Sequence, residues 1–342
     1  MDGSMKAMAL VEIGKPLEEI ELDDPIPADN EVILEVTACG VCQTDLKIIS
    51  GVHPTIKRLK KLPHVMGHEI AGVVRETGSN VKDWQIGDRA VVSFYIGCGT
   101  CKFCHTGRTP LCTNLQDSIG FTCNGGFAEK VKVPANNLVR ISSKIPDEEA
   151  AIIPDAIGTA VHAVIDRGEV RVGERVLILG AGGVGLHALQ VIRMCGAYTI
   201  VADIDNRKLE LAKQFGADET VFANKENAAL IKVDKIFETS GALCDNMWLL
   251  DCLERGGTII TVGYRVDATM KIDVMSLVSN EYVIKGSRAC AITSVQAAVD
   301  MVERGLLKPI VSVRYPFSQA NEALADLAAG KIDGRAVLCR TL

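Results

Sequence analysis

Four cysteines within fifteen residues are the part of this 342-residue chain whose types and spacing point most directly to chemistry. Cys98, Cys101, Cys104 and Cys112 are separated by two, two and seven residues. One short lobe of backbone can therefore bring four thiolates around a tetrahedral ion such as zinc, at about 2.3 Å per Zn–S contact. Because four thiolates leave no open coordination position, the run predicts a structural zinc and places the reactive chemistry elsewhere.

A glycine-rich segment points to a dinucleotide. Gly180, Gly182 and Gly185, with Gly183 and Val184 between them, follow an apolar stretch and open an amphipathic one. At a turn from strand to helix, such glycines permit a tight turn, close approach of the backbone to a pyrophosphate, and close packing of helix on strand. The segment predicts a dinucleotide-binding unit.

The carboxylate that ends the next predicted strand extends this motif. Asp203 lies 23 residues after Gly180, where it can accept hydrogen bonds from the adenosine ribose hydroxyls. This favours NAD over NADP. Asp203 could instead cap a helix predicted over 206–215, and Lys208 in that helix is a candidate to contact the ribose or a phosphate.

Four more candidate metal ligands are far apart in the sequence: Cys42 in CGVCQTDL, His68 and Glu69 in GHE, and Asp155 in IIPDAIGTAVHAV. Catalytic zinc usually has three protein ligands and one open position, so a thiolate, an imidazole and a carboxylate would suffice. Taken singly, Cys42 could be a buried apolar thiol and Asp155 a helix cap. As a set they are candidates for a reactive zinc site.

Two sequence textures indicate the elements that position these residues. Up to about residue 150, short alternating segments are separated by Gly, Pro and Asp, which is typical of strands. From about residue 156, apolar strands alternate with helix-length amphipathic stretches, which predicts a parallel, doubly wound sheet. The expected strands are 32–37, 70–76, 89–94, 175–179, 199–203, 235–238, 258–262 and 335–339, and the expected helices near the end are 294–304 and 318–329.

Composition limits the class of protein. With 48% hydrophobic residues, 342 residues are enough for two packed cores. A net charge of −6, spread along the chain, argues against nucleic acid and anionic membranes as partners. No apolar run approaches the ~20 residues that cross a bilayer. Twelve cysteines without a secretory signal favour metal ligands in a reducing compartment, so we expect a soluble, cytoplasmic protein.

The one basic cluster consists of Lys57, Arg58, Lys60 and Lys61. It is either a solvated loop or a contact for an anionic group of a substrate. The second interpretation gives a slight preference for an anionic or phosphate-bearing substrate.

CGVCQTDL, GHE, the four-cysteine run and GAGGVG with Asp203 occur in an order that resembles the zinc-containing medium-chain alcohol dehydrogenases, over nearly the whole chain. The resemblance implies an α/β protein with a GroES-like β-rich catalytic domain, residues 1–155 completed by 289–342, and a Rossmann NAD-binding domain, residues 156–288. It implies further that catalytic zinc is bound by Cys42, His68 and Asp155, and that Glu69 enters or leaves the coordination sphere. Family members often have cysteine as the third ligand, and aspartate keeps its charge with a harder oxygen.

Other catalytic roles carry over one position at a time. Thr44 matches the hydroxyl that receives the substrate proton, and Asp45 matches the carboxylate behind the zinc-bound histidine. Phe94 matches a wall of the substrate pocket. Where many members have a histidine that passes the proton to water, this chain has Lys47, a poor shuttle unless its pKa is depressed. His53 or bulk water are the alternatives.

The resemblance also implies cofactor contacts outside the glycine motif. Thr159 and Val262 match residues beside the nicotinamide, although ordinary helix and strand packing would explain both. Arg335 matches an arginine that reaches the pyrophosphate.

The implied reaction is hydride transfer between an alcohol and NAD, giving an aldehyde or ketone, with one catalytic and one structural zinc in each chain of a homodimer or homotetramer. Primary, secondary, polyol and hydroxyacyl alcohols all stay open as substrates. One alternative is a zinc-independent enoyl or quinone reductase of the same fold. Another is a zinc-ribbon binding module fused to a nucleotide sensor.

Overall fold

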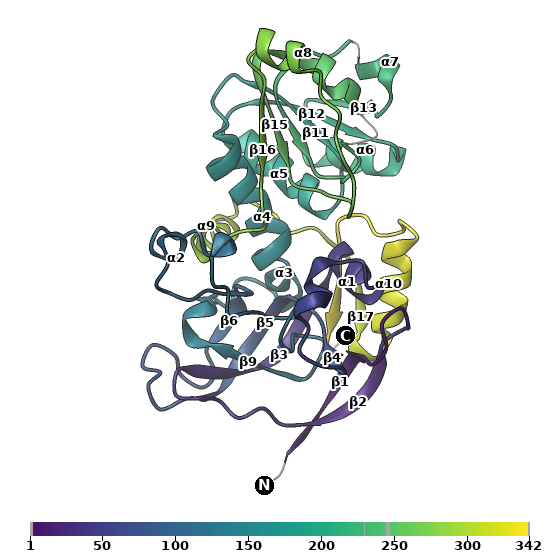
Figure 1. Cartoon of the computed structure of the whole chain (residues 1–342). Coiled ribbons are helices and arrows are strands. Elements are labelled where there is room, and N and C mark those ends of the chain that lie inside the picture. The colour runs from purple at the N-terminus through teal and green to yellow at the C-terminus, as the bar shows by residue number, and fades with distance from the viewer. Residues whose placement is uncertain (1–2, 229, 244–246, 341–342) are drawn as a thin grey trace. The chain divides into compact units, whose positions relative to one another are not determined.

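The computed structural model describes residues 3–228, 230–243 and 247–340, which form two compact units (Figure 1). The first unit comprises residues 1–155, 291–305 and 311–342, and the second comprises 156–290 and 306–310. The chain thus passes from one unit to the other at Asp155 and Ala156. The short segment 306–310 was not expected in the second unit, because five residues carry no periodic pattern.

The first unit is built mainly from antiparallel strands. A seven-stranded sheet has the order β10-β6-β5-β3-β18-β17 with β9 paired to β3, a second sheet has the order β2-β1-β4, and β7 pairs with β8. Its strands are β1 Ser4–Leu10, β2 Glu18–Asp23, β3 Glu31–Val41, β4 His64–Val65, β5 Glu69–Thr77, β6 Arg89–Val92, β7 Tyr95–Ile96, β8 Asp117–Ser118, β9 Lys130–Pro134, β10 Leu138–Arg140, β17 Val311–Pro316 and β18 Arg335–Cys339. Its helices are α1 Gln43–Ile49, α2 Lys102–His105, α3 Asp147–Ala151, α9 Ile292–Glu303 and α10 Ala320–Ala328.

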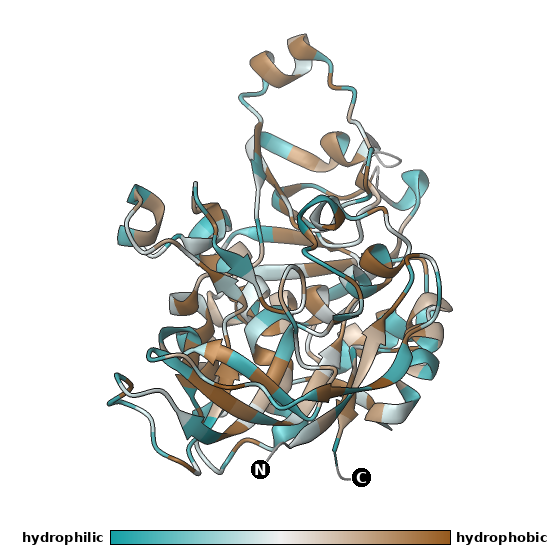
Figure 2. Cartoon of the chain, turned by 60° about the horizontal axis from the view of Figure 1, so that its bottom comes forward, coloured by the Kyte–Doolittle hydropathy of each residue, from teal (hydrophilic) through white to brown (hydrophobic). Residues whose placement is uncertain are grey.

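Strand β3 brings distant parts of the chain to one place. It pairs with β5 so that Gly40 lies opposite Glu69, and with β18 so that Val41 lies opposite Ala336. Its buried side chains, such as Leu34 and Val36, form part of the core. Figure 2 shows hydrophobic and hydrophilic segments alternating along strands of the fold, as expected for sheets that bury one face.

The second unit contains one parallel sheet with the order β13-β12-β11-β14-β15-β16. This is the doubly wound order of dinucleotide-binding folds, so the predicted fold class is confirmed. Its strands are β11 Arg175–Leu179, β12 Tyr198–Asp203, β13 Glu219–Phe222, β14 Val233–Glu238, β15 Leu253–Thr261 and β16 Val283–Gly286. Its helices are α4 Gly158–Val161, α5 Gly183–Met194, α6 Asn206–Gln214, α7 Lys225–Ala228 and α8 Val274–Ser279.

Two local features differ from the sequence prediction. Strand β15 begins at Leu253, five residues before the expected start, because Glu254 to Gly257 interrupt its apolar pattern without breaking the strand. Asp155 is not a helix cap but lies inside a π-helical segment, Ile153–Ile157. Single π-helical turns are common at functional sites and have no signature of their own in the sequence.

Hydropathy and helix length bear on the membrane question. Among the residues that the structure describes, no helix is both long and apolar enough to cross a bilayer.

Candidate metal centres and dinucleotide site

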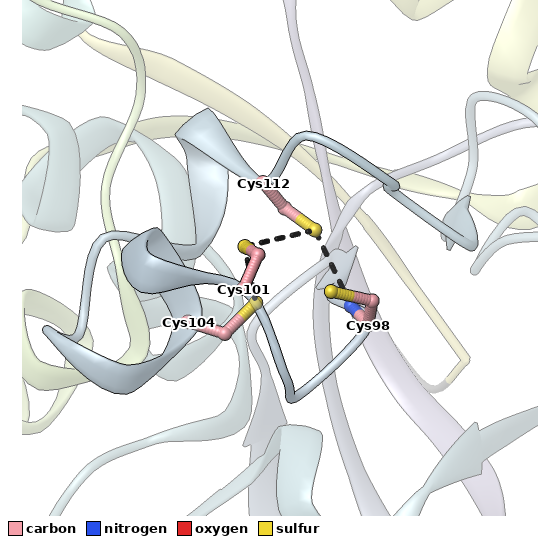
Figure 3. A group of neighbouring side chains, drawn as sticks. All are labelled: Cys98, Cys101, Cys104 and Cys112. Carbon is pink, nitrogen blue, oxygen red and sulfur yellow. Dashed lines mark hydrogen bonds between the residues drawn. The ribbon is translucent and has the colours of Figure 1, made fainter.

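The four cysteines of the 98–112 run come together at one point (Figure 3). The Cys101 sulfur lies 3.6 Å from that of Cys104 and 3.8 Å from that of Cys112. A tetrahedral zinc with contacts of about 2.3 Å would separate its sulfur ligands by about 3.8 Å. Gly99, with a φ of +73°, makes the turn between the first two cysteines. The cluster therefore has the dimensions of a four-thiolate zinc site.

The thiols of this cluster differ in acidity before any metal binds. Hydrogen bonds from the backbone N–H groups of Cys104 and Thr113 lower the pKa of Cys101 to about 5. Burial, together with the neighbouring sulfurs, raises the pKa of Cys104 to about 12. At neutral pH the cluster thus offers a ready thiolate to an incoming cation, and a bound metal would deprotonate the others.

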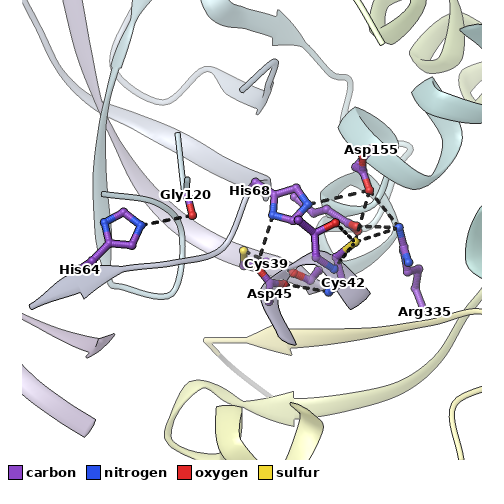
Figure 4. Close-up of polar contacts among 11 residues, drawn as sticks. Cys39, Cys42, Asp45, His64, His68, Gly120, Asp155 and Arg335 are labelled. Carbon is purple, nitrogen blue, oxygen red and sulfur yellow. Dashed lines mark hydrogen bonds and ion pairs between the residues drawn. The ribbon is translucent and has the colours of Figure 1, made fainter. Parts of the chain in front are cut away.

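A second cluster contains Cys42, His68, Glu69 and Asp155, whose ligand atoms all lie within 4.8 Å of one another. Figure 4 shows Cys42, His68 and Asp155 gathered at one place. All four residues are buried. They come from the start of α1, the approach to β5, the first residue of β5 and the π-helical segment. Residues up to 113 positions apart in the sequence therefore converge, as the metal-site interpretation requires.

Helix α1 positions Cys42 and its neighbours. Cys42 is the N-cap residue, its sulfur accepts a hydrogen bond from the Thr44 N–H at 3.5 Å, and its own N–H donates to the Asp45 carboxylate at 2.9 Å. The Thr44 hydroxyl lies 3.6 Å from the Cys42 sulfur. The reciprocal cap fixes the thiol at the end of β3 and places the Thr44 hydroxyl beside the cluster.

Asp45 also holds His68. One Asp45 oxygen lies 3.4 Å from His68 Nδ1, which leaves Nε2 directed at the cluster, 3.9 Å from the Asp155 carboxylate. Burial lowers the pKa of His68, but the negative charge of Asp45 outweighs it, and the pKa stands well above its ordinary value. This is the carboxylate–histidine arrangement that orients an imidazole toward a metal.

The Glu69 side chain needs a glycine at the position opposite it in the sheet. A Cβ atom at Gly40, opposite Glu69 in the sheet, would collide with the Glu69 carboxylate. Glu69 is fully buried, and burial raises its pKa well above the ordinary range. Its Oε2 atom has no hydrogen-bond partner among the described residues. An unpartnered buried carboxylate oxygen of this kind fits a residue that can bind a cation.

Arg335 belongs to this cluster, and the sequence did not place it there. Its guanidinium Nη2 lies 2.9 Å from Glu69, 3.0 Å from Asp155 and 3.8 Å from the Cys42 sulfur. Because Arg335 begins β18, which pairs with the end of β3, it is carried next to Cys42. Its predicted pyrophosphate contact stays a prediction, whereas its Nη2 atom contacts three members of the metal-ligand set.

The donors of this second cluster fit zinc. Zinc contacts of about 2.0–2.3 Å to nitrogen, oxygen and sulfur imply ligand separations of about 3.3–3.8 Å. The Cys42 sulfur lies 3.7 Å from Asp155 Oδ2, and His68 Nε2 lies 3.9 Å from the same oxygen. Burial raises the pKa of the Cys42 thiol, but Arg335 and His68 reverse this and lower it. A thiolate, an imidazole and carboxylates balanced by one arginine leave a buried negative set that a divalent cation would complete.

Aromatic rings wall this cluster on one side. The His68 ring lies 5.4 Å from Phe94 and 4.6 Å from Phe121, measured between centroids, and the two phenylalanines are 5.4 Å apart. Phe94 was expected near the substrate. Phe121 was missed, since it lies in no motif and meets His68 only through the fold.

The glycine turn of the second unit has the features that a pyrophosphate site needs. Gly180 has a φ of +100°, and a Cβ atom at Gly185 would collide with the Gly180 carbonyl oxygen. Gly182 caps α5 and faces open space, so that no neighbouring atom lies within 4 Å of a Cβ built there. Gly183 and Val184 form the first turn of α5. Backbone N–H groups at this helix start are available to an anion.

Asp203 ends β12 beside this turn, and the structure rules out its alternative role as a helix cap. The N-cap of α6 is Asp205, whose side chain accepts a hydrogen bond from the Arg207 N–H. Asp203 instead accepts hydrogen bonds from the N–H groups of Ala181, at 2.7 Å, and Asp205, at 2.9 Å. It therefore ties the glycine turn to the following loop, and each oxygen keeps capacity for a second donor.

The remaining predicted positions are placed as follows. Thr159 is buried in α4, and Lys208 lies half-buried in α6. Val262 follows β15, and its N–H donates to the Glu238 carbonyl at 2.8 Å. Lys47 lies on α1, where burial lowers its pKa and the charge of Cys42 partly opposes the shift. His53 caps the next helical turn, and its Nδ1 accepts a hydrogen bond from the Thr55 N–H.

The basic cluster is partly engaged within the protein. Lys60 pairs with Asp117 at 2.6 Å, and Arg58 donates to the Leu115 carbonyl at 2.9 Å. These contacts favour a structural role for two of its four members.

Comparisons with known proteins agree with this picture. Residues 28–147 match the family model described as the alcohol dehydrogenase GroES-like domain, and residues 183–304 match that described as zinc-binding dehydrogenase. An alcohol dehydrogenase of Geobacillus stearothermophilus is 34% identical over 341 residues, covering 98% of each chain. An acryloyl-coenzyme A reductase of Sulfurisphaera tokodaii is 31% identical over 307 residues, covering 87% of this chain and 88% of the relative.

The chain is also similar to a solved structure in three dimensions. A cobalt- and zinc-bound thermostable alcohol dehydrogenase from Pyrobaculum aerophilum superposes with a TM-score of 0.90 at 28% identity, covering 98% of this chain and 100% of that one. The fold and site thus define an oxidoreductase of two domains. The chain belongs to the zinc-containing medium-chain alcohol dehydrogenase family. Membership of this family contradicts the alternative that the chain is a zinc-ribbon binding module fused to a nucleotide sensor.

Proposed function

We propose that this protein is an NAD-dependent alcohol dehydrogenase that interconverts an alcohol with its aldehyde or ketone, with a catalytic zinc held by Cys42, His68 and Asp155. The observation that carries the proposal is the convergence of these three buried side chains, with Glu69, within 4.8 Å. We propose a second, structural zinc at Cys98, Cys101, Cys104 and Cys112. Cytoplasmic location and assembly as a homodimer or homotetramer stay predictions from the sequence.

The residues around the catalytic site have separate tasks. Bound zinc would supply Lewis acidity, which favours the deprotonated hydroxyl of an alcohol and polarises a carbonyl. Asp45 keeps His68 in the orientation that presents Nε2. The Thr44 hydroxyl lies 3.6 Å from the Cys42 sulfur, and we propose that it receives the substrate proton. We propose that Glu69 either pairs with Arg335, as in this structure, or binds the metal in place of Asp155.

The cofactor is proposed to be NAD, bound by the second unit. Gly180, Gly182 and Gly185 would hold the pyrophosphate, and Asp203 the adenosine ribose. We retain the roles predicted for Lys208 at the ribose or phosphate, Thr159 and Val262 beside the nicotinamide, and Arg335 at the pyrophosphate. The relatives support NAD(P) chemistry in general, and the carboxylate of Asp203 is the reason to propose NAD, because a 2′-phosphate would meet its negative charge.

The aromatic side chains beside the candidate metal site favour a substrate whose reacting end is uncharged. Phe94 and Phe121 contact His68, so the carbon that gives up hydride would lie against aromatic surface. Arg58 and Lys60 are engaged with Leu115 and Asp117, which weakens the case for an anionic substrate group at the basic cluster. We therefore propose a small alcohol with an apolar substituent.

A reductase of the same fold is the second candidate, because the acryloyl-coenzyme A reductase is similar over most of the chain. A zinc-independent enoyl or quinone reduction would leave Cys42, His68 and Asp155 without a common purpose. Their convergence in a buried site favours alcohol chemistry.

The test is NADH formation by the purified, zinc-loaded protein with a panel of alkyl, aryl, polyol and phosphorylated alcohols. We expect small apolar alcohols to give the highest kcat/KM and a chelator to abolish the activity, with zinc restoring it. NADH oxidation by enoyl thioesters without alcohol-dependent NADH formation would contradict the proposal. If reversing the charges of Lys57 and Lys61 raises KM for phosphorylated alcohols alone, the anionic substrate is favoured after all.

Lys47 gives the proton relay a distinctive pH dependence. Only its neutral amine can accept a proton, and burial lowers its pKa, so the neutral fraction grows as the pH rises through that lowered pKa. Alcohol oxidation should rise with pH over the same range. In Lys47→Met the rate should no longer rise with pH, and kcat near neutrality should fall by about 100-fold, the lower end of the contribution of a general acid or base. His53→Gln serves as the comparison, since loss of the rise in that variant would assign the relay to His53.

A further inference from the structure

A buried carboxylate that no proposed step uses lies beside the glycine turn. Glu238 is the last residue of β14, is fully buried, and pairs in the sheet with Leu179 of β11 and Thr261 of β15. Strand β14 therefore lies between β11, which leads into the glycine turn, and β15, which leads to Val262. The site of Glu238 is the switch point at which doubly wound sheets bind their ligands.

The Glu238 carboxylate folds the turn that follows it. Its Oε1 atom accepts hydrogen bonds from the N–H groups of Ser240 at 2.9 Å, Gly241 at 2.8 Å and Ala242 at 3.2 Å, and from the Ser240 hydroxyl. Burial raises the pKa of Glu238, and these hydrogen bonds oppose the rise. Its Oε2 atom has no hydrogen-bond partner within the described part of the chain. One oxygen thus organises three consecutive backbone N–H groups.

This turn lies directly against the glycine turn. The Thr239 hydroxyl lies 2.8 Å from the Gly180 carbonyl oxygen and 3.0 Å from that of Leu179, and the Thr239 N–H donates to Leu179 at 2.9 Å. A Cβ atom on Gly180 would lie 3.0 Å from the Ser240 backbone nitrogen. Gly180 thus makes its left-handed turn between Ala202, which accepts its N–H, and Thr239, which donates to its carbonyl.

The same turn reaches the predicted nicotinamide side. The Glu238 carbonyl accepts hydrogen bonds from the N–H groups of Val262 and Gly263, at 2.8 and 2.9 Å. A Cβ atom on Gly263 would collide with the Gly241 nitrogen. One small turn is therefore bonded or packed against both the pyrophosphate part and the nicotinamide part of the predicted cofactor site.

We propose that Glu238 and Thr239 are positioning residues of the dinucleotide site: the Glu238 carboxylate folds the 239–242 turn, and the Thr239 hydroxyl holds the Gly180 carbonyl so that the glycine turn presents its N–H groups to the pyrophosphate. This inference rests on the proposed binding of NAD at Gly180 to Gly185. It assigns a role to two residues that need not touch the cofactor. Their effect should appear in affinity, and chiefly for the pyrophosphate part of the ligand.

The experiment measures dissociation constants of the full-length protein for NADH and for ADP-ribose, which has the pyrophosphate but no nicotinamide. Thr239→Val should weaken both ligands by about five- to tenfold, the change expected for one lost hydrogen bond. Thr239→Ser, which keeps the hydroxyl, should stay within about twofold of the parent. Thr199→Val is the matched control. It also removes a buried threonine hydroxyl, one that is bonded to Asp218, but Thr199 lies at the start of β12, the end away from Asp203 and the glycine turn.

Glu238→Gln tests the first half of the link. The amide of the substituted side chain would place N–H groups at the position of the Glu238 Oε2 atom, where no hydrogen-bond partner is present among the described residues. Buried N–H groups without an acceptor should weaken the 239–242 turn. We expect a similar loss of affinity, and a loss in the double variant with Thr239→Val that is smaller than the product of the two, since both act through one turn. Thermal unfolding is measured in parallel to distinguish a loss of cofactor affinity from a general loss of stability. A general loss of stability would lower Tm without changing the affinity of the folded protein.

The outcomes are distinct. If the parent binds neither NADH nor ADP-ribose, both the proposed cofactor site and this inference are overturned. If the parent binds both and Thr239→Val changes neither dissociation constant by more than about twofold, the inference alone is overturned. Weaker NADH binding with unchanged ADP-ribose binding would also contradict it, because the effect would then pass through Val262.

Discussion

Cys42→Ser should lower kcat by at least about 1000-fold while the dissociation constant for NADH stays within about twofold of the parent. A serine hydroxyl does not ionise near neutrality, so the cluster would lose both a soft ligand and a negative charge. Lewis acidity contributes several kcal/mol, and about 4 kcal/mol corresponds to a 1000-fold change in rate. The rate of the chemical step is measured under single-turnover conditions, as the oxidation of NADH by the aldehyde or ketone that corresponds to the best alcohol substrate.

Cys39→Ser is the matched control for this prediction. Cys39 lies three residues before Cys42, on β3, is also buried and belongs to neither cluster. It should retain activity within a few-fold of the parent. Near-parental turnover in Cys42→Ser, or an equal loss in both variants, would contradict the assignment of Cys42 to the metal.

Arg335→Leu should destabilise the metal-free protein by about 3–5 kcal/mol. The substitution leaves Glu69, Asp155 and Cys42 buried without their counter-charge, and breaking one side of a buried ion pair has a cost of this size. Zinc would restore positive charge, so the loss should be smaller in zinc-loaded protein. By linkage, the variant should then bind zinc more tightly than the parent does. Urea unfolding of chelated and zinc-loaded samples measures all three quantities.

Arg340→Leu provides the comparison for this stability change. Arg340 follows β18 and pairs with Glu35 at a position where the arginine side chain is 40% exposed. Exposed pairs contribute about 0–1 kcal/mol, so this variant should be near-parental with or without zinc. Equal unfolding free energies for Arg335→Leu and the parent without metal would show that Arg335 does not balance the cluster.

The sequence predicted features that depend on local spacing. The four cysteines of the 98–112 run lie close enough in sequence that one short lobe of backbone brings them together. The glycine turn follows the same logic, because β11, the turn and α5 are consecutive. For both, a short segment contains nearly all the information that its geometry requires.

The second cluster needed more than local spacing. Cys42, His68 and Asp155 are linked only by pairing between strands and by the π-helical segment, so single residues could not be separated from buried thiols and caps without the family resemblance. Arg335 and Phe121 were not predicted to lie beside them, because their positions depend on the register of β18 against β3 and on loop packing. A buried arginine that opens a strand carries no signal in the sequence.

Two neighbouring aspartates show a smaller limit of the same kind. Asp203 and Asp205 both precede α6 and both satisfy the preferences for a helix cap. Only the coordinates show that Asp205 caps the helix while Asp203 bonds to the glycine turn. The choice depends on where β12 ends, which sequence patterns fix to within a few residues.

The zinc content of three purified proteins tests the central claim most directly. We predict two zinc ions per chain in the parent, one in Cys42→Ser and one in Cys101→Ser, because the two clusters are separate and each needs its cysteine. A parent with one zinc per chain that Cys42→Ser retains would contradict the catalytic metal site.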